Sequence, residues 1–376
     1  MKENFQFQTS TDAIALNKGI TFEGGSFVEQ YGIKILNLRG TWKAMGRQYG
    51  HFAAKYIRDV YHNFMLPKIA EKSDAEAKVV DIAEKLYQTL PYRFKMLFAG
   101  AVETSGLSLE ELKMANVVEY AAPEYNCSAM AAWGDYTGGE LVYGRNYDGP
   151  FHQLCNDLLV TVYHPNDGSL AVATIGYAGE IYVVNGINEK GLFVELNNGM
   201  PSAGSEILYD RLSGTTELMR MLFDADTIDY VDAFFRTTKG FASFIIGVAD
   251  SKEARSYEWC AEGMRRGDGA TPDGLMVMTN HYLNESWTYP IPNDEQCWLS
   301  QTRRCNLLSQ AEQHKGTINV KLMQQLMGTF IEEGGPRHEL TVYQLVFVPQ
   351  SMKLWIRITN LTDWQCVDLR RLMIND

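Results

Sequence analysis

The feature that most constrains the fold is a change of sequence character near Pro123, a third of the way along this 376-residue chain. Residues 40–120 carry helix signals, including capping-box patterns at 73–76 and 108–111. From Pro123 to about residue 200, short runs of branched and aromatic residues alternate with turn signals. The sequence therefore predicts an α+β fold, in which a mainly helical segment precedes a β-rich part.

The expected elements suggest sheets covered by helices, because strands group at both ends of the β-rich part and helices lie between them. We expect helices at 215–224, 228–236, 300–313 and 320–330. We expect strands at 33–38, 141–143, 158–163, 170–175, 181–184, 192–196, 243–248, 255–259, 275–278, 341–348 and 352–358.

Charge and hydropathy exclude several classes of partner. The net charge is −12 and no run of Lys or Arg stands out, which argues against binding to nucleic acid or to anionic membranes. No apolar run reaches the roughly 18 residues that a membrane span needs. The first residues lack the apolar core of a signal peptide. We expect a cytoplasmic protein, or an exported one from which a signal peptide has been removed; the oligomeric state is not predicted.

The six cysteines are scattered, without a CxxC pair and without the Cys/His spacing of a metal site. In a chain of this length they do not form a disulfide framework, and neither a metal nor an organic cofactor is implied. A cysteine chosen blindly is usually a small buried hydrophobe. A chemical role therefore needs a second observation.

Cys127 has such an observation, because Gly144-Arg145-Asn146-Tyr147-Asp148 follows it after one expected strand and turn. A hairpin would return Arg145 and Asp148 close to the sulfur. A nearby cation lowers the pKa of a thiol. Asp148 would orient Arg145, or hold an α-amine if the chain is cut before Cys127. Such an amine, with a pKa near 7.7–8, could serve as the general base without a histidine.

Cys-Ser followed by a strand and Gly-Arg-Asn-x-Asp resembles the start of the N-terminal-nucleophile cysteine hydrolases. These include choloylglycine hydrolases, acyl-CoA:6-aminopenicillanic acid acyltransferases and acid-ceramidase-like amidases. The resemblance implies a four-layer αββα sandwich at 127–376. It also implies that residues 1–126 are a mainly helical pro-region, removed autocatalytically at Asn126-Cys127.

Further motifs of this superfamily follow in the same order. The segment 188–198 resembles a strand that supplies an oxyanion-hole asparagine, either Asn198 or its neighbour Asn197. Thr279-Asn280 resembles a second oxyanion motif. The helix start at 300–303 resembles one that carries an active-site arginine, here Arg303, with Arg304 as the rival.

The part before Cys127 resembles the acyltransferase branch. Met45-Gly46-Arg47-Gln48-Tyr49-Gly50 and Gly106-Leu107-Ser108 lie where that pro-region has similar motifs. A bile-salt hydrolase begins almost at its cysteine, whereas 126 residues precede Cys127 here. The long leading segment therefore favours the acyltransferase or ceramidase-like branches.

The expected activity is hydrolysis of a linear amide in a small N-acyl compound, through a thioester on Cys127. Tyr147 and Phe151 would line the acyl pocket. Transfer of the acyl group to an amine is the alternative, as are an esterase activity or a non-catalytic homologue that binds acyl ligands. His281, which follows Asn280, would suit a Cys–His protease, but such a site needs no Arg145/Asp148 hairpin.

Overall fold

The structure is a computed structural model, and it describes residues 13–15, 19–70, 75–121, 125–267 and 269–374. Two sequence predictions fall outside this part. They are the capping box that begins at Ser73 and the change of character placed at Pro123. The second expected capping box is present, because Ser108 and Glu111 bond to one another's backbone amides at the start of a helix.

Over the described residues, ten strands form one sheet in the order β1-β2-β3-β6-β7-β8-β9-β10-β11-β12. Its pairs are antiparallel except for β3 and β6, which run parallel. Their bounds are β1 (Ile20–Phe22), β2 (Gly25–Gln30), β3 (Ile33–Gly40), β6 (Leu158–Pro165), β7 (Val172–Tyr177), β8 (Asn185–Asn188), β9 (Phe193–Asn198), β10 (Phe244–Ala249), β11 (Ala254–Cys260) and β12 (Gly263–Arg266).

The second sheet has seven strands over the same residues, all paired antiparallel, in the order β13-β14-β4-β5-β15-β16-β17. Their bounds are β13 (Ala270–Thr271), β14 (Leu275–Met278), β4 (Asn126–Ala132), β5 (Val142–Asp148), β15 (Thr341–Val348), β16 (Lys353–Ile358) and β17 (Thr362–Asp368).

The α-helices fall into an early group before Cys127 and a later group that covers the two sheets. Their bounds are α1 (Trp42–Val60), α2 (Leu66–Ala70), α3 (Ala75–Thr89), α4 (Tyr92–Ser105), α5 (Leu109–Ala115), α6 (Val118–Ala121), α7 (Met200–Ala203), α8 (Gly214–Leu222), α9 (Ile228–Thr237), α10 (Ser300–Gln313), α11 (Val320–Gly328) and α12 (Leu369–Met373).

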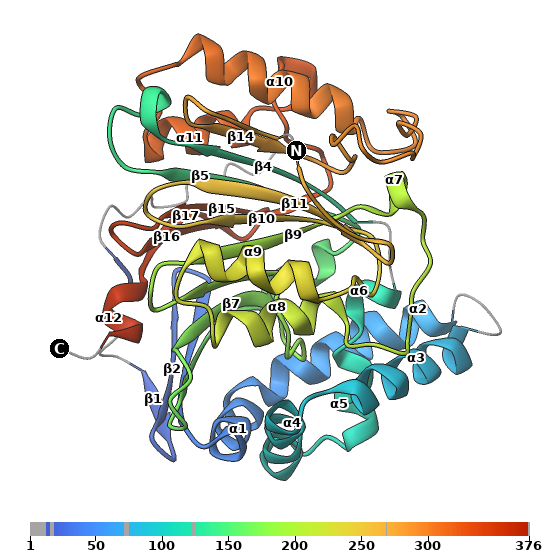
Figure 1. Cartoon of the computed structure of the whole chain (residues 1–376). Coiled ribbons are helices and arrows are strands. Elements are labelled where there is room, and N and C mark those ends of the chain that lie inside the picture. The colour runs from blue at the N-terminus through green and yellow to red at the C-terminus, as the bar shows by residue number, and fades with distance from the viewer. Residues whose placement is uncertain (1–12, 16–18, 71–74, 122–124, 268, 375–376) are drawn as a thin grey trace, which may run out of the picture.

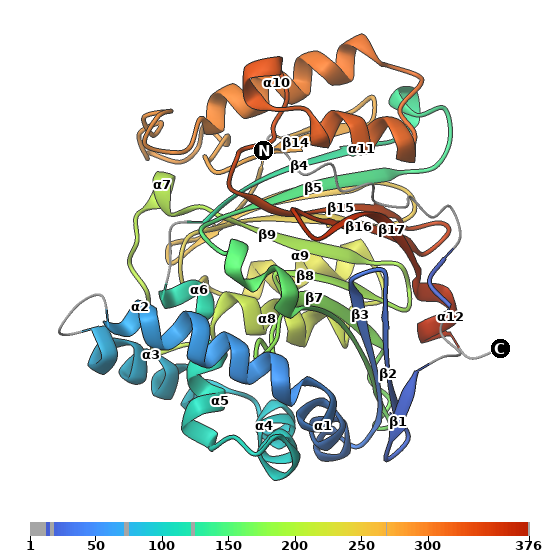
Figure 2. The same ribbon diagram turned by 180° about the vertical axis from the view of Figure 1, so that it is seen from behind.

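The two sheets pack face to face between two layers of helices, as Figures 1 and 2 show. Helices α10 and α11 cover the seven-stranded sheet, and α8 and α9 cover the ten-stranded sheet. This is the expected αββα sandwich. Inner strands such as β10 and β15 are buried on both faces, so they read as nearly continuous apolar runs rather than alternating ones, whereas the edge strands β1 and β12 are partly exposed.

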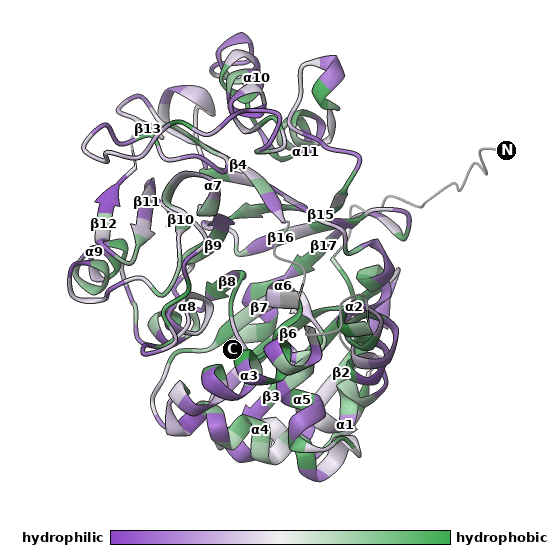
Figure 3. Ribbon diagram, turned by 90° about the vertical axis from the view of Figure 1, so that its right-hand side faces the viewer, coloured by the Kyte–Doolittle hydropathy of each residue, from purple (hydrophilic) through white to green (hydrophobic). Residues whose placement is uncertain are grey.

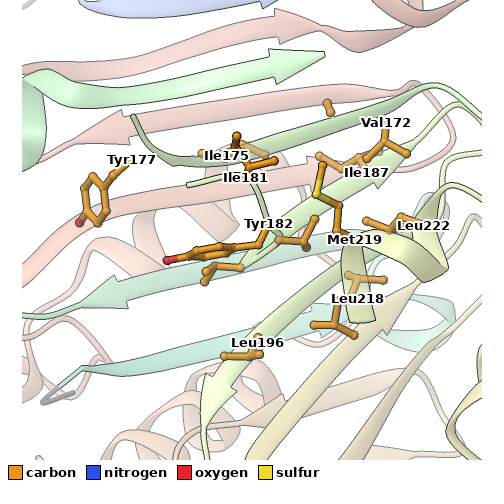
Figure 4. Close-up of a cluster of buried hydrophobic side chains, with 14 of the residues drawn as sticks. Val172, Ile175, Tyr177, Ile181, Tyr182, Ile187, Leu196, Leu218, Met219 and Leu222 are labelled. Atoms are coloured by element: carbon orange, nitrogen blue, oxygen red, sulfur yellow. The ribbon is translucent and has the colours of Figure 1, made fainter. Parts of the chain in front are cut away.

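The hydrophobic core continues from the sheets into the helix layers. Figure 4 shows Leu218, Met219 and Leu222 of α8 against Ile187 and Leu196 of the ten-stranded sheet. In Figure 3, β6, β7 and β8 are mostly green, whereas α3 and α5 mix purple and green. The helices thus present one apolar side to the sandwich and a polar side outward.

One expected strand is absent, because residues 181–184 form bends within the described chain rather than a strand. Their apolar side chains are buried, which explains the strand-like pattern. Their backbone amides bond elsewhere: Ile181 N donates to Asn116 Oδ1 at 2.7 Å, and Val183 N donates to the Thr215 carbonyl at 3.2 Å. A side-chain acceptor and a carbonyl at the start of helix α8 thus replace the partners of a sheet ladder.

The segment before Cys127 is built into the sandwich. Its strand β3 pairs with β6 over six residue pairs, from Ile35 with Val160 to Gly40 with Pro165. Its helix α1 packs against both strands. Backbone cleavage at Cys127 would leave these contacts in place, so the two pieces would stay associated.

The glycine at position 46 of the 45–50 motif allows two helices to pack closely. Helices α1 and α4 cross so closely that a Cβ added at Gly46 would lie 2.2 Å from the Leu97 carbonyl oxygen. A Cβ at Gly100 would lie 2.2 Å from the Lys43 carbonyl oxygen. The backbone itself blocks any larger residue at these crossing points.

We predict that Gly46→Ala lowers the free energy of unfolding by about 1–3 kcal/mol, because the helices must separate to admit the methyl group. Urea unfolding measures this loss. Gly139→Ala is the matched control, since a Cβ there meets no atom within 4 Å. Equal stability of the two variants would contradict the close helix crossing.

Candidate active site

Cys127 is the second residue of β4, and the β4–β5 hairpin brings the predicted residues to it. Cys127 pairs with Tyr147, and Arg145 pairs with Ala129. The Cys127 side chain is fully buried. Its Sγ lies 3.0 Å from Arg145 Nη2 and 4.0 Å from the Leu196 carbonyl oxygen. The sulfur is therefore buried beside a cation rather than in an apolar cavity.

Arg145 is held by the ten-stranded sheet rather than by Asp148. Its guanidinium forms an ion pair with Glu195 at 2.8 Å and donates to Asn185 Oδ1 at 2.5 Å and to the Leu196 carbonyl at 2.5 Å. The expectation that Asp148 orients Arg145 was wrong, because Glu195 has that position. Glu195 stands two residues before Asn197 on β9, and the alternation of the strand puts both on one face.

Burial decides the ionisation of the thiol in the intact chain. It raises the pKa of Cys127 to about 12, and the Arg145 guanidinium opposes this shift only in part. The nearby charge of Glu195 also raises this pKa. Arg145 alone thus does not produce a thiolate at neutral pH, contrary to the simple effect of a neighbouring cation.

Arg303 contacts the other side of the Cys127 backbone. It is fully buried at the start of α10, and its Nη1 donates to the Cys127 carbonyl and to Ser128 Oγ, both at 2.6 Å. Its Nη2 donates to Asn280 Oδ1 at 2.8 Å. Arg304, the rival, is only half-buried at the next position. The helix thus presents Arg303 to the site.

Asp148 lies beside this second guanidinium. Its Oδ2 is 3.8 Å from Arg303 Nη1, and its Oδ1 accepts from Thr341 Oγ1 at 2.6 Å. Burial raises the pKa of Asp148, while Arg303 and the Thr341 hydrogen bond counteract the shift. Asp148 also pairs with Asn126 across the β4–β5 hairpin, so it lies beside the bond expected to be cleaved.

Asn280 binds the main-chain nitrogen of the candidate nucleophile. The Cys127 N–H donates to Asn280 Oδ1 at 3.0 Å, and Asn280 Nδ2 donates to the Asn198 carbonyl at 2.9 Å. Asn280 N in turn donates to Ser300 Oγ at 2.8 Å. In the intact chain the Asn280 side chain therefore positions the nitrogen of Cys127, and its amide hydrogens are directed to another carbonyl.

Asn197 and Asn198 both reach the edge of the site, from opposite faces of β9. Asn197 Nδ2 donates to the Thr279 carbonyl at 2.9 Å. Asn198 Nδ2 donates to the carbonyl of Tyr125, two residues before Cys127, at 3.1 Å. Asn198 is thus the one that contacts the chain entering the nucleophile.

His281 contacts Ser300 and Thr279 rather than the Cys127 sulfur, so it is not placed to act as a general base. Its Nδ1 lies 2.8 Å from Ser300 Oγ and 3.3 Å from Thr279 Oγ1. Burial and then the charges of Arg304 and Arg303 lower the pKa of His281 to about 4. The imidazole is therefore neutral at physiological pH and helps to anchor the start of α10.

An apolar pocket adjoins the site. It encloses about 580 Å³ of empty space, part of it open to solvent. Four of its nine lining residues come from the segment before Cys127 and five come from the chain after it. The lining residues are Ile82, Glu119, Tyr120, Tyr125, Met200, Ser205, Ile207, Thr215 and Phe244.

The two residues expected to line an acyl pocket lie deeper. Tyr147 and Phe151 are almost fully buried, and their ring centroids are 5.9 Å apart. Tyr147 also stacks on Tyr343 at 4.8 Å. It reaches the pocket indirectly, by donating from its hydroxyl to Glu119 Oε1 at 2.8 Å. The sequence patterns did not reveal Glu119, because an acidic residue in a helical segment usually signals an exposed face.

Two kinds of feature are absent from the described residues. No helix there has the length and apolar character needed to cross a bilayer. The same residues contain no cluster of three or more His, Cys, Asp or Glu side chains that could bind a metal ion.

The pH dependence of stability tests whether the Cys127 thiol is buried. We predict that the intact wild-type chain loses about 1.4 kcal/mol of stability relative to Cys127→Ala between pH 8 and pH 10. A raised pKa in the folded state gives stability that is complete below the unfolded pKa and is lost as the pH rises toward the folded value. Urea unfolding of both chains measures the difference. A difference that does not change with pH would show that the thiol is not buried as described.

The comparison with solved structures found chains similar to this one, whereas no match was found among the curated proteins. Three of these structures resemble it at TM-scores of 0.41–0.45. The N-acylethanolamine-hydrolyzing acid amidase ortholog of Caenorhabditis elegans is 21% identical over 59% of this chain and 93% of its own, at a TM-score of 0.45. A variant of the conjugated bile acid hydrolase of Clostridium perfringens is 12% identical over 66% and 95%, at 0.45. Penicillin V acylase of Agrobacterium tumefaciens is 9% identical over 65% and 87%, at 0.41.

A family model for acyl-coenzyme A:6-aminopenicillanic acid acyl-transferase matches residues 136–362. This range is more than half of the chain and contains Arg145, Glu195, Asn280 and Arg303, while Cys127 lies nine residues before it. The chain therefore belongs to the acyl-coenzyme A:6-aminopenicillanic acid acyl-transferase family and is an enzyme of the N-terminal-nucleophile type.

Proposed function

We propose that Cys127 is the nucleophile of an enzyme that cleaves the amide bond of small N-acyl compounds. The observation that carries this proposal is the contact of Cys127 Sγ with Arg145 Nη2 at 3.0 Å, in a buried site where Asn280 holds the nitrogen of the same residue. Sγ forms a bond to the acyl carbon, the C–N bond breaks, and the amine leaves with a proton. Water then cleaves the thioester to release the acid.

Activation requires a free α-amine at Cys127. In the intact chain the nitrogen is a peptide N–H, which accepts no proton, and the pKa of the thiol is raised to about 12. An α-amine has an ordinary pKa of roughly 7.7–8, so it can take the thiol proton at neutral pH and later donate it to the leaving amine. The bond to Asn280 Oδ1 would orient this amine.

The same residues would carry out the cleavage that exposes the amine. Cys127 Sγ attacks the carbonyl carbon of Asn126, and the acyl group moves from nitrogen to sulfur. Water then hydrolyses this thioester, which leaves Asn126 as a new C-terminus and Cys127 as a new N-terminus. The buried carboxyl of Asp148, opposite Asn126, lies where it could handle a proton in this step.

The pocket favours an acyl substrate over a peptide. Its wall is mainly apolar and lies next to the expected oxyanion position, since Phe244 pairs with Asn198 and Tyr125 accepts the Asn198 hydrogen bond. A hydrocarbon chain gains about 0.8 kcal/mol for each buried methylene group. The acyl part would therefore supply most of the binding energy.

Acyl transfer is the second candidate, and the description of the matched family favours it. An amine would then resolve the thioester in place of water. Hydroxylamine added during turnover separates the two activities. A hydroxamate yield that saturates as the hydroxylamine concentration rises indicates a bound amine and acyl transfer, whereas a yield that rises in simple proportion indicates interception of a hydrolytic thioester.

We predict that incubation of the purified chain yields a fragment that begins at Cys127, detected by mass spectrometry. Cys127→Ala should stay intact. Because β3 and β6 remain paired, both fragments of the wild type should elute together in size-exclusion chromatography. An uncleaved chain that hydrolyses amides at full rate would refute the role of the α-amine.

We further predict that Asn198→Ala lowers kcat about 10²–10³-fold on a panel of N-acyl amides, through loss of an oxyanion donor. The cleaved fraction of each variant is determined first, so that slow maturation is not mistaken for slow turnover. Asn197→Ala is the comparison variant. A larger loss at Asn197 would assign the oxyanion role to that residue instead.

A further inference from the structure

Glu119 is a carboxyl group in the wall of an otherwise mainly apolar pocket. It lies on the short helix α6 and is 4% exposed. Its Oε1 accepts the Tyr147 hydroxyl at 2.8 Å. In the described part of the chain, Oε2 accepts no hydrogen bond, although the residue lines the pocket. Buried carboxyl groups normally satisfy both oxygens, so this one is left for a partner in the pocket.

A second buried carboxyl nearby shows the satisfied arrangement. Glu180 accepts the Tyr182 hydroxyl on Oε1 at 2.7 Å and the Tyr177 N–H on Oε2 at 2.8 Å. It is buried to a similar degree, with 6% exposure. Glu119 differs from Glu180 because it lines the pocket and its Oε2 accepts no hydrogen bond from any described residue.

Burial also sets the protonation of Glu119. It raises the pKa of Glu119 to about 7, against the opposing effects of the Tyr147 hydrogen bond and the Arg145 charge. Near neutral pH the group is therefore present both as a carboxylic acid and as a carboxylate. The acid can donate and accept a hydrogen bond, and the carboxylate can accept.

The carboxyl is also connected to the candidate nucleophile. Tyr147, which donates to Glu119, is the residue opposite Cys127 in the β4–β5 hairpin. Tyr125, another lining residue, stands two positions before Cys127. An acyl chain attached to Cys127 Sγ and directed into this pocket would thus meet the carboxyl along its length.

We propose that Glu119 determines specificity by selecting acyl chains that carry a neutral hydroxyl group over all-hydrocarbon chains. This inference rests on the proposed function, because it names the acyl class of the same site. A hydroxyl both donates and accepts, so it suits either protonation state. A purely apolar chain would cover Oε2 without a partner, which costs binding energy.

The test measures binding without catalysis, on the full-length Cys127→Ala chain. Isothermal titration calorimetry compares octanamide with isomers hydroxylated at each chain carbon in turn. We expect at least one isomer to bind about 10-fold more tightly than octanamide, the size of a well-formed hydrogen bond in a buried pocket. Glu119→Leu should reverse this preference.

Two further variants protect the test against misfolding. Glu119→Gln keeps an acceptor for Tyr147 and should retain a preference for the hydroxylated isomer. Glu180→Gln is the matched control, a change at a buried carboxyl whose oxygens are both satisfied, and it should leave the preference intact. The proposal is overturned if no isomer binds more tightly than octanamide, if nothing binds, or if the preference persists in Glu119→Leu.

Failure of the proposed function would look different. It would appear as an absence of amide cleavage and of selective thiol labelling at Cys127 in the wild-type chain. The pocket is already partly open to solvent in the intact chain. The binding comparison in Cys127→Ala therefore depends on neither result, and each idea can fail alone.

Discussion

The ion pair between Arg145 and Glu195 is the interaction on which the site depends, because it joins the two sheets beside the sulfur of Cys127. Arg145 and Cys127 lie on neighbouring strands of the seven-stranded sheet, whereas Glu195 lies on β9 of the other sheet. All three side chains are fully buried. Taking a charge out of water costs several kcal/mol unless it is paired and hydrogen-bonded. The packing of the two sheets pairs Arg145 with Glu195, so the site forms only when the sheets pack against each other.

This arrangement also explains which contacts of the site local sequence patterns reveal. Cys127 and Arg145 lie on one hairpin and on one face of it, whereas Asp148, three residues after Arg145, lies on the opposite face beside Arg303. Glu195 belongs to the other sheet, and its contact with Arg145 depends on how two sheets stack. Neither spacing nor periodicity within one strand carries that information.

The fold shows the same division between local and long-range information. Helices such as α10 and strands such as β15 follow from local patterns, and their bounds match the expected ones. The segment 181–184 has the apolar residues typical of a strand, but its backbone amides donate to Asn116 Oδ1 and to the Thr215 carbonyl. Burial was predictable from the residues, whereas the source of the hydrogen-bond partners was not.

Under the proposed mechanism, the chain before Cys127 occupies contacts that a substrate would need. The Tyr125 carbonyl accepts from Asn198, and the peptide nitrogen of Cys127 is bound by Asn280. The same segment also provides Glu119 and part of the pocket wall. A cut before Cys127 would therefore have two separate effects. It would free an amine and release Tyr125 from the oxyanion position, while strand β3 would keep the pocket wall in place. Under the proposed mechanism this segment blocks the site before cleavage and completes the pocket afterwards, so it has to stay bound, and its pairing with β6 provides the means.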